Sequence, residues 1–374
     1  MESAEKERQM IKAAAAKTAE KIVQPRAAEI DATGIIPRDI LDAFGKQGFL
    51  SIILPEEYGG SDGDVPSFCL LVEEIAKVSG SSSLLLLAQG VGLLPIWVAG
   101  SPSQKERYFT QISEKNSLAA FALNEPEPGL DPSFIKTMAG RKEKDYLLNG
   151  RKSFITNGSI AQLYTVFALT PKGLSAFVVE DGTPGLRFGQ KGEKIGMKGS
   201  VTTDVIFEDC QVPQENRLGE EGEGWAIARK TLALSRPAMG AQAVGIAQGA
   251  LEYAVHYAKE RIQFGKPISS FQAIQFMIAD MTAQVEAARS LVYKAAVQIQ
   301  AGLEGAEQLS AAAKCYASEV AMRVTTDAVQ ILGGYGYMKD YPVERMMRDA
   351  KVTQIYEGAN QILRAMVAQD LLKE

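Results

Sequence analysis

The periodicity of apolar residues changes twice along the chain, and this change most limits the folds that it can adopt. The first part has mainly helical spacing, the middle part has short β-rich runs between turn residues, and the last part returns to long amphipathic helical patterns. We therefore predict an α+β protein. Its parts are an N-terminal helical domain (1–116), a barrel-like middle β domain (117–223) and a C-terminal helical bundle (224–374).

The predicted β domain contains a strong local turn signal. Asn149 and Gly150 separate two β-rich runs, and both positions of a type I′ turn need the positive φ that these residues tolerate. We therefore predict a two-residue hairpin at this point. The predicted strands are 118–123, 146–148, 152–156, 164–169, 176–179 and 204–207.

The C-terminal region is expected to form a bundle of helices. Gly333 and Gly334 follow the third helical pattern, where a C-cap is expected. Pro237 predicts a kink or local opening in the first helix, and Arg236 just before it faces either a cleft or solvent. The predicted helices are 225–261, 267–301, 306–332 and a terminal helix after Gly358.

One N-terminal segment, 81–98, is apolar and contains no charged residue. Serines, glycines and Pro95 interrupt it, which argues against a membrane span. We interpret it as a buried core helix, with the alternative that the same helix also lines an apolar pocket.

Charge and cysteine content exclude several classes of protein. The 374 residues include 40 basic and 45 acidic ones, for a net charge of -5, and no basic block that would follow a nucleic acid backbone. The charged N-terminus predicts neither a signal peptide nor a membrane anchor. Three widely spaced cysteines argue against disulfides or a cysteine zinc site and favour the cytoplasm. We expect neither nucleic acid nor membrane as a partner.

The single histidine, His256, leaves no second imidazole, so we predict no metal site and find no support for a serine or cysteine triad. We interpret His256 as an ordinary helix residue. The glycine-rich stretches 219–224 and 333–336 do not match the dinucleotide or P-loop templates. A Rossmann or P-loop enzyme is therefore disfavoured.

Near the C-terminus, Glu357 stands among apolar neighbours and directly before Gly358. Burial raises the pKa of a carboxyl group toward neutrality, where it can accept a proton from a weak carbon acid. Gly358 lets backbone or ligand approach closely, and the free N–H groups of the following helix could face a pyrophosphate. The sequence therefore predicts Glu357 as a candidate general base.

Six segments carry a family resemblance, and nearly the whole chain shares it. They are FALNEP at 121–126, NGRKSFITNG at 149–158, FEDCQVP at 207–213, RIQFGK at 261–266, QILGGYG at 330–336 and YEG at 356–358. In this order they resemble the acyl-CoA dehydrogenase family, which predicts that family's fold.

The resemblance implies an FAD enzyme that removes the α proton and the β hydride of an acyl-CoA thioester, leaving a trans-2-enoyl-CoA. Glu357 matches the usual base, and flavin N5 is the expected hydride acceptor. The Glu357 backbone N–H and a flavin ribose hydroxyl are the expected donors to the thioester oxygen. Some family members place the base at the position of Ser235, where serine cannot serve.

The resemblance also implies roles for other residues. Without it, the three phenylalanines among them would be interpreted as core aromatics and the glycine pair as a helix stop. The flavin ring is expected near Phe121, Leu123, Asn124, Phe154 and Thr156. The rest of FAD is expected near Arg261, Gln263, Phe264, Gln272, Gln330, Gly333, Gly334, Ala359 and Gln361, partly from a neighbouring subunit. The expected substrate contacts are Arg236 at the CoA portion, Tyr356 and Gly358 at the thioester, and Leu130 near the CoA chain.

Four positions, 124, 127, 128 and 130, depart from the family pattern in the segment NEPEPGLD, 124–131, where Thr-Glu-Pro-Gly-Ala-Gly-Ser-Asp is common. Asn124 can still donate a hydrogen bond toward flavin N5, whereas Leu130 cannot donate one near the CoA chain. Elsewhere, Ala359 replaces a frequent threonine beside the cofactor phosphates. These departures leave the substrate route and the electron acceptor open.

The segment 83–94, expected to close the acyl pocket, contains no arginine or lysine, so a second substrate carboxylate would lack an ion-pair partner. We predict a non-dicarboxylic acyl-CoA substrate, which leaves straight, branched, alicyclic and aromatic-derived groups open. The expected partners are an electron-transfer flavoprotein and further copies of the chain in a dimer of dimers, a homotetramer. Alternatives are a cyclic acyl-CoA dehydrogenase of aromatic or alicyclic degradation, an oxygen-using oxidase or monooxygenase, and a non-catalytic scaffold.

Overall fold

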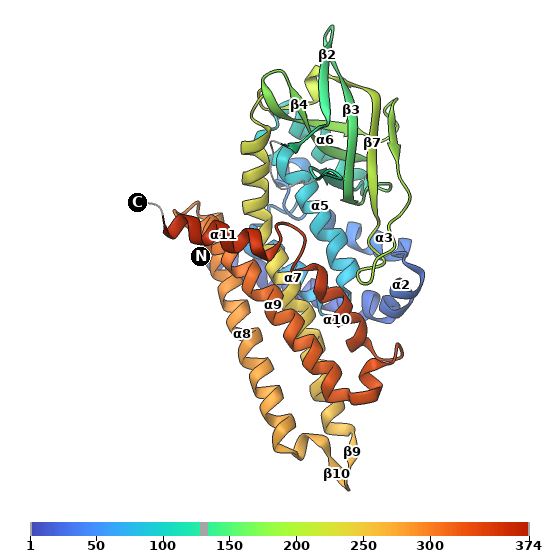
Figure 1. Ribbon diagram of the computed structural model, residues 1–374, viewed down its shortest axis with the longest axis vertical. Helices are drawn as coiled ribbons and strands as arrows, with labels where there is room; N and C mark the ends of the chain where they lie inside the picture. Colours follow the sequence, from blue (N-terminus) through green and yellow to red (C-terminus); the bar gives the residue numbers. More distant parts are fainter. Residues whose placement is uncertain (1, 128–133, 373–374) are drawn as a thin grey trace.

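In the computed structural model, which describes residues 2–127 and 134–372, a sheet from the middle of the chain packs against helices from both ends of the chain (Figure 1). The sheet lies at one end of the molecule, and the longest helices extend to the other end. The predicted α+β fold, with N- and C-terminal helical domains and a middle sheet domain, is confirmed.

Some of the N-terminal helices begin at residues whose side chains cap them. Asp64 accepts a hydrogen bond from the Ser67 backbone N–H, and Ser101 and Gln104 form a capping box. These caps satisfy N–H groups that a helix cannot pair internally. The helices are α1 (Glu2–Thr18), α2 (Ala27–Thr33), α3 (Arg38–Lys46), α4 (Val65–Ala76), α5 (Gly80–Ala99) and α6 (Pro102–Lys115).

The middle domain is an eight-stranded sheet with the order β6-β7-β3-β2-β4-β5-β8, and β1 pairs in parallel with β4. Most neighbouring pairs are antiparallel, and the strands β4 and β5 are buried along nearly their whole length. The strands are β1 (Ala119–Ala122), β2 (Met138–Lys142), β3 (Asp145–Thr156), β4 (Leu163–Thr170), β5 (Gly173–Glu180), β6 (Leu186–Phe188), β7 (Thr202–Pro213) and β8 (Arg217–Leu218).

The predicted hairpin at Asn149-Gly150 is wrong. Both residues lie inside β3, which continues past them because it pairs with β2 on one side and β7 on the other. The register with β7 shifts between Leu148 and Gly150, so the local turn signal produces an irregularity in a long strand. The actual turn between β2 and β3 includes Glu143, whose φ is 54°.

The C-terminal helices form a bundle in which α7, α8 and α9 pack on one another. Helix α7 runs through Pro237 without a break in its assignment, and α9 ends where Gly333 takes a φ of 62°. The elements are α7 (Gly224–Glu260), β9 (Ile262–Gln263), β10 (Lys266–Pro267), α8 (Gln272–Gln300), α9 (Ala306–Leu332), α10 (Pro342–Val352) and α11 (Asn360–Leu371).

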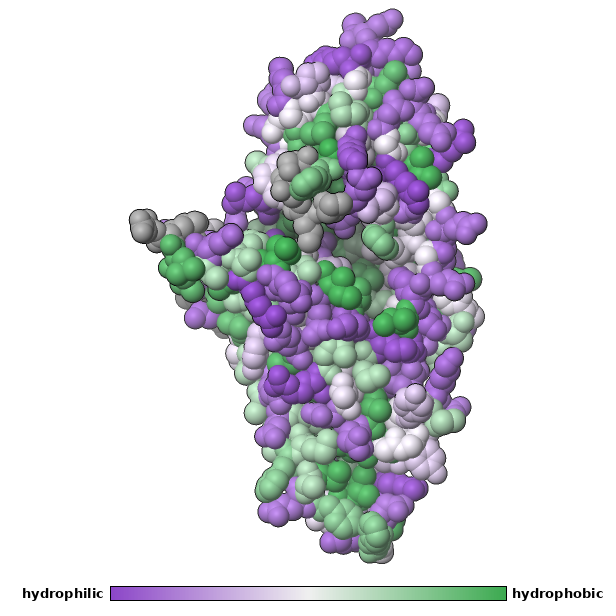
Figure 2. All heavy atoms as spheres, viewed as in Figure 1, coloured by the Kyte–Doolittle hydropathy of each residue, from purple (hydrophilic) through white to green (hydrophobic). Residues whose placement is uncertain are grey.

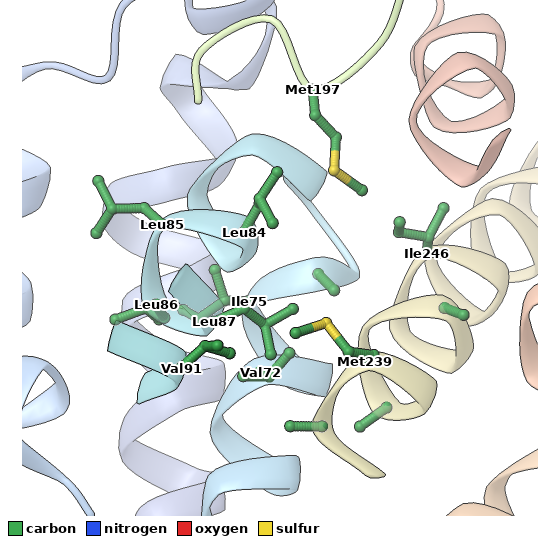
Figure 3. Close-up of a cluster of buried hydrophobic side chains, with 14 of the residues drawn as sticks. Val72, Ile75, Leu84, Leu85, Leu86, Leu87, Val91, Met197, Met239 and Ile246 are labelled. Carbon is green, nitrogen blue, oxygen red and sulfur yellow. The ribbon is translucent and has the colours of Figure 1, made fainter. Parts of the chain in front are cut away.

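Helix α5 connects the three domains. A Cβ atom at Gly92 would lie 2.7 Å from the Ala120 backbone nitrogen, so only glycine lets α5 approach β1 this closely. The Gln89 side chain accepts a hydrogen bond from the Ala119 backbone N–H at 2.7 Å. On the other side, Leu84 and Val91 share a buried cluster with Met239 of α7 (Figure 3). Helix α5 is apolar and long enough to cross a membrane, but 83% of its most apolar 18-residue window is buried inside the protein.

Candidate active site

A cavity of about 430 Å³ opens where α5, α7, the sheet and the loop before α11 meet. Figure 2 shows hydrophobic side chains around a hollow at mid-height of the molecule. Among the lining residues within the described ranges, Glu357 is the only carboxylate. The predicted residues that line this cavity are Phe121, Leu123, Asn124, Phe154, Thr156, Arg236, Tyr356, Glu357 and Gly358.

Glu357 lies in a turn between α10 and α11 with an unusual backbone. Its φ is 54° and that of Gly358 is 96°, so two successive residues adopt left-handed conformations. The Asn360 backbone N–H donates to the Gln354 carbonyl at 3.1 Å and closes the turn. A non-glycine residue in this region costs about 1 kcal/mol, which the surrounding contacts must offset. Helix α11 begins at Asn360, as the apolar spacing after Gly358 predicts.

Burial raises the pKa of the Glu357 carboxyl above its usual range. The charge of Arg236, a hydrogen bond from Ser235 and the charge of Lys314 oppose this rise, in decreasing order. The Ser235 hydroxyl donates to Glu357 Oε2 at 3.3 Å. The carboxylate therefore lies in a cavity wall where it is partly desolvated but still has polar and cationic neighbours.

Arg236 lines this cavity from α7. Of the two predicted orientations, toward a cleft or toward solvent, the structure shows the first. It is 6% exposed, and its Nε has no hydrogen-bond partner among the described residues. Burial lowers the pKa of the guanidinium, and Glu357 opposes that shift. A buried, unpaired N–H costs free energy unless a ligand satisfies it. Arg236 can therefore donate to a polar group of a bound ligand.

Tyr356 connects the turn to α7. Its hydroxyl donates to Gln242 Oε1, and Gln242 Nε2 donates to Ser83 Oγ at 2.8 Å. Burial raises the pKa of Tyr356 well above its ordinary value, so the phenol remains a donor. This chain of hydrogen bonds joins the loop before α11, helix α7 and the start of α5.

The sheet contributes a wall that fits a flat aromatic ring. Phe154, with a φ of 58°, is 77% exposed although it lies at the cavity, and Thr156 follows it on β3. Nearby, Lys152 Nζ donates to the Leu123 carbonyl at 3.1 Å and pairs with Glu125 at 2.7 Å. An uncovered phenylalanine beside hydroxyl and amide groups is the surface that an isoalloxazine ring would cover. The residues present therefore fit a flavin.

A second hollow, of about 460 Å³, lies near the other end of the bundle. It is lined by four of the predicted FAD residues, Arg261, Gln263, Gly333 and Gly334. Gly333 stands 19 residues after Lys314 on α9, and Lys314 contacts Gly358 beside the first cavity. At 1.5 Å per residue, the two sites are roughly 28 Å apart along the helix. One chain therefore divides the predicted FAD residues between two separate places.

The remaining predicted residues line neither hollow. Phe264 is 92% exposed, and Gln272 and Gln330 are exposed on the bundle surface. Ala359 and Gln361 flank the start of α11 beside the first cavity. Leu130 lies outside the described residues, so its predicted substrate contact has no structural counterpart here. His256 is an exposed helix residue, 3.3 Å from Glu260.

Several residues at the cavity were not singled out from the sequence. Trp225, Arg229 and Met239 line it from α7, and Lys314 supports the turn from α9. Lys314 did carry a signal, because it falls three residues after Ala311 and three before Ala317, on the buried face of its helix. A lysine in such a position needs a specific partner.

The chain matches known protein domain families over nearly its whole length. The acyl-CoA dehydrogenase N-terminal, middle and C-terminal domain families match residues 5–116, 120–210 and 222–372. The chain belongs to the acyl-CoA dehydrogenase family. It is 49% identical over 356 residues to cyclohex-1-ene-1-carbonyl-CoA dehydrogenase of Syntrophus aciditrophicus, covering 94% of this chain and 86% of that protein.

Two solved structures are similar over 98% of this chain and 98% of theirs, each with a TM-score of 0.95. One is butyryl-CoA dehydrogenase from Megasphaera elsdenii, 46% identical. The other, 50% identical, is a chain from work on the electron transferring flavoprotein of Acidaminococcus fermentans. As an acyl-CoA dehydrogenase, this protein is an oxidoreductase that uses FAD. The expectation of that family and cofactor is confirmed.

Proposed function

We propose that this acyl-CoA dehydrogenase converts a non-dicarboxylic acyl-CoA thioester to its 2-enoyl-CoA, with Glu357 as the base. One observation carries the proposal: Glu357 is the only carboxylate among the described residues of the cavity, and burial raises the pKa of its carboxyl. The α C–H of a thioester is a weak acid, so a desolvated carboxylate suits its removal. The alternative of a non-catalytic scaffold does not account for this placement.

The residues of this chain bind, orient and deprotonate. Arg236 would satisfy its unpaired Nε on the CoA portion, and Tyr356 and Gly358 would flank the thioester. The Glu357 backbone N–H would donate to the thioester oxygen as negative charge develops there, so donor and base belong to one residue. A bound acyl group packed against the apolar side chains of α5 and α7 would exclude water from the carboxylate.

FAD, when bound, supplies an acceptor for the β hydride. We assign Phe121, Leu123, Asn124, Phe154 and Thr156 to the flavin wall, because they line the same cavity as Glu357. Arg261, Gln263, Gly333 and Gly334 would bind the adenosine part of a cofactor held by a neighbouring subunit. Their distance from Glu357 along α9 supports this division.

We infer a homo-oligomer, with the dimer of dimers as its expected form, from the same division of the FAD residues. The end of the bundle that includes β9 is also hydrophobic at its surface (Figure 2), where Ile262 and Phe264 are exposed. An exposed hydrophobic surface beside a divided cofactor site suits contact with another copy.

The acyl portion is expected to lie against α5. Its wall consists of Leu84, Ala88 and Val91, with Met239 opposite on α7, and none of these four side chains could pair with a second carboxylate. The two arginines of the cavity, Arg229 and Arg236, lie at other positions of α7. The similarity to a cyclohex-1-ene-1-carbonyl-CoA dehydrogenase keeps a cyclic acyl group as the second candidate substrate.

An electron-transfer flavoprotein is the proposed electron acceptor, and the similar chain from work on such a flavoprotein supports it. An oxygen-using oxidase or monooxygenase is the alternative chemistry. We infer a reducing, cytoplasmic location, which suits the three buried cysteine thiols.

The decisive experiment is anaerobic titration of the FAD-loaded protein with straight, branched, alicyclic and dicarboxylic acyl-CoA thioesters. Loss of the oxidised flavin absorbance with a monocarboxylic substrate, together with formation of enoyl-CoA, is the expected result. Reduction by dicarboxylic thioesters alone, or none by any thioester, would contradict the proposal. Turnover under oxygen without another acceptor would favour the oxidase alternative.

A further inference from the structure

Lys314 is a buried lysine in direct contact with the turn that contains the candidate base. It lies on α9 and is 1% exposed. Its ammonium donates to the Gly358 carbonyl at 2.8 Å and to Asn360 Oδ1 at 3.3 Å. An ammonium costs several kcal/mol to bury and is retained where its charge or its hydrogen bonds have a use.

The two acceptors stand on either side of the start of α11. Asn360 is itself held, because its Nδ2 donates to Ser318 Oγ at 2.9 Å. Lys314 and Ser318 are four residues apart on α9, so they project from one face of the helix. This face of α9 therefore holds the backbone immediately after Glu357 by hydrogen bonds, at the point where Gly358 has a left-handed φ of 96°.

The charge of Lys314 also acts on the carboxylate. The groups that affect Glu357 are Arg236 and Ser235 from α7 and Lys314 from α9, and all three favour its ionised form. The groups that affect Lys314 are Glu357, Cys315 and Arg236, of which only Arg236 opposes its charge. Burial lowers the pKa of Lys314 to about 8, so the ammonium is charged at neutral pH.

We propose that Lys314 is a positioning residue for Glu357. Its hydrogen bond to Gly358 holds the Glu357–Gly358 turn against α9, and its positive charge favours the ionised form of the carboxylate. The catalytic meaning of this inference rests on the proposed role of Glu357 as the base. The effect of the Lys314 charge on the ionisation of the Glu357 carboxyl can be measured without substrate.

The test compares Lys314→Gln, which keeps a donor without the charge, with Lys314→Arg, which keeps the charge, and with Lys314→Met, which keeps neither. The first readout is the infrared band of the protonated Glu357 carboxyl against pH, assigned by its absence in Glu357→Gln. Removing a neighbouring positive charge makes ionisation harder, so the midpoint should rise in the Gln and Met variants, by roughly 0.3 pH units. It should stay near the wild-type value in the Arg variant.

The second readout is the pH profile of anaerobic flavin reduction by acyl-CoA, which should move in the same direction. Lys194→Met serves as the control, because Lys194 also has a pKa lowered by burial to about 8 but is not among the charges that act on the Glu357 carboxyl. This control should leave both midpoints unchanged.

An infrared midpoint in Lys314→Gln equal to that of the wild type would overturn the inference, whether or not Lys314→Met folds. A shift of the same size in Lys314→Arg would also overturn it, because charge would then not be the cause. If no acyl-CoA reduces the wild-type flavin, the proposed function fails. The infrared midpoints still decide the electrostatic role of Lys314.

Discussion

The Ser235 hydroxyl on α7 donates to Glu357 Oε2 at 3.3 Å, across 122 positions of sequence. Ser235 stands directly before Arg236, so two adjacent residues of α7 supply a hydroxyl and a buried cation to one carboxylate. The serine, which cannot itself be a base, therefore contributes to the environment of the candidate base.

Ser235→Ala is expected to raise the pKa of Glu357, because the lost hydrogen bond favours the ionised form. The pH midpoint of anaerobic flavin reduction should move upward by about half a unit, with a several-fold slower rate on its acidic side. Stopped-flow absorbance across a pH series would measure this. Ser175→Ala, which changes a buried serine of β5, is the control. An unchanged profile in Ser235→Ala would mean that the hydroxyl has no influence on the base.

Glu357→Gln is expected to keep FAD and acyl-CoA binding but to slow flavin reduction by about 10³-fold, because an amide cannot accept the α proton. Single-turnover reduction and equilibrium binding of acyl-CoA would separate chemistry from affinity. Glu319→Gln, which loses only an ion pair with Arg364, should react at the wild-type rate. Fast reduction by Glu357→Gln would eliminate this residue as the base.

Tyr356→Phe is expected to destabilise the protein by about 1–3 kcal/mol, because Gln242 Oε1 loses its donor in a buried site. Denaturant unfolding of the wild type and the variant would give this difference. The matched control is Tyr337→Phe, since Tyr337 is exposed and its change should cost less than about 0.5 kcal/mol. Equal stability of Tyr356→Phe and wild type would refute the role of this hydrogen bond.

The difference in stability between Asp349→Asn and wild type is expected to favour the variant more at pH 7 than at pH 4. Burial raises the pKa of the Asp349 carboxyl from 3.8 to about 6, although it accepts a hydrogen bond from the Met197 backbone N–H. The folded state therefore binds more protons than the unfolded state between these pH values, and stability decreases as pH rises through 6. The neutral amide avoids this loss, which amounts to about 3 kcal/mol at most.

Thermal unfolding of wild type and Asp349→Asn at several pH values would measure the difference. Asp340→Asn, at an exposed position, is the control and should show no comparable pH dependence. A constant difference between wild type and Asp349→Asn from pH 4 to pH 7 would contradict the shifted pKa of this carboxyl.

Local patterns predicted the long helices of the bundle and five of the strands, but they missed β2, β6 and β8 and misjudged one connection. Helical spacing predicts α8 and α9, because one face of each helix must be apolar to pack in the bundle. The Asn149-Gly150 pair has the chemistry of a hairpin turn, yet it lies inside β3. Pairing with both β2 and β7 outweighed the local preference, because a long strand gains hydrogen bonds along both edges.

The sequence by itself determined the order of helical and β regions, the family resemblance and the Glu357–Gly358 pair, because these depend on neighbouring residues and periodic spacing. Only the tertiary structure decided what surrounds that carboxylate. Ser235, Arg236 and Lys314 reach Glu357 from two different helices. The pKa of a buried group depends on burial and on charges close in space, and neither can be read from separations of 43 to 122 residues along the chain.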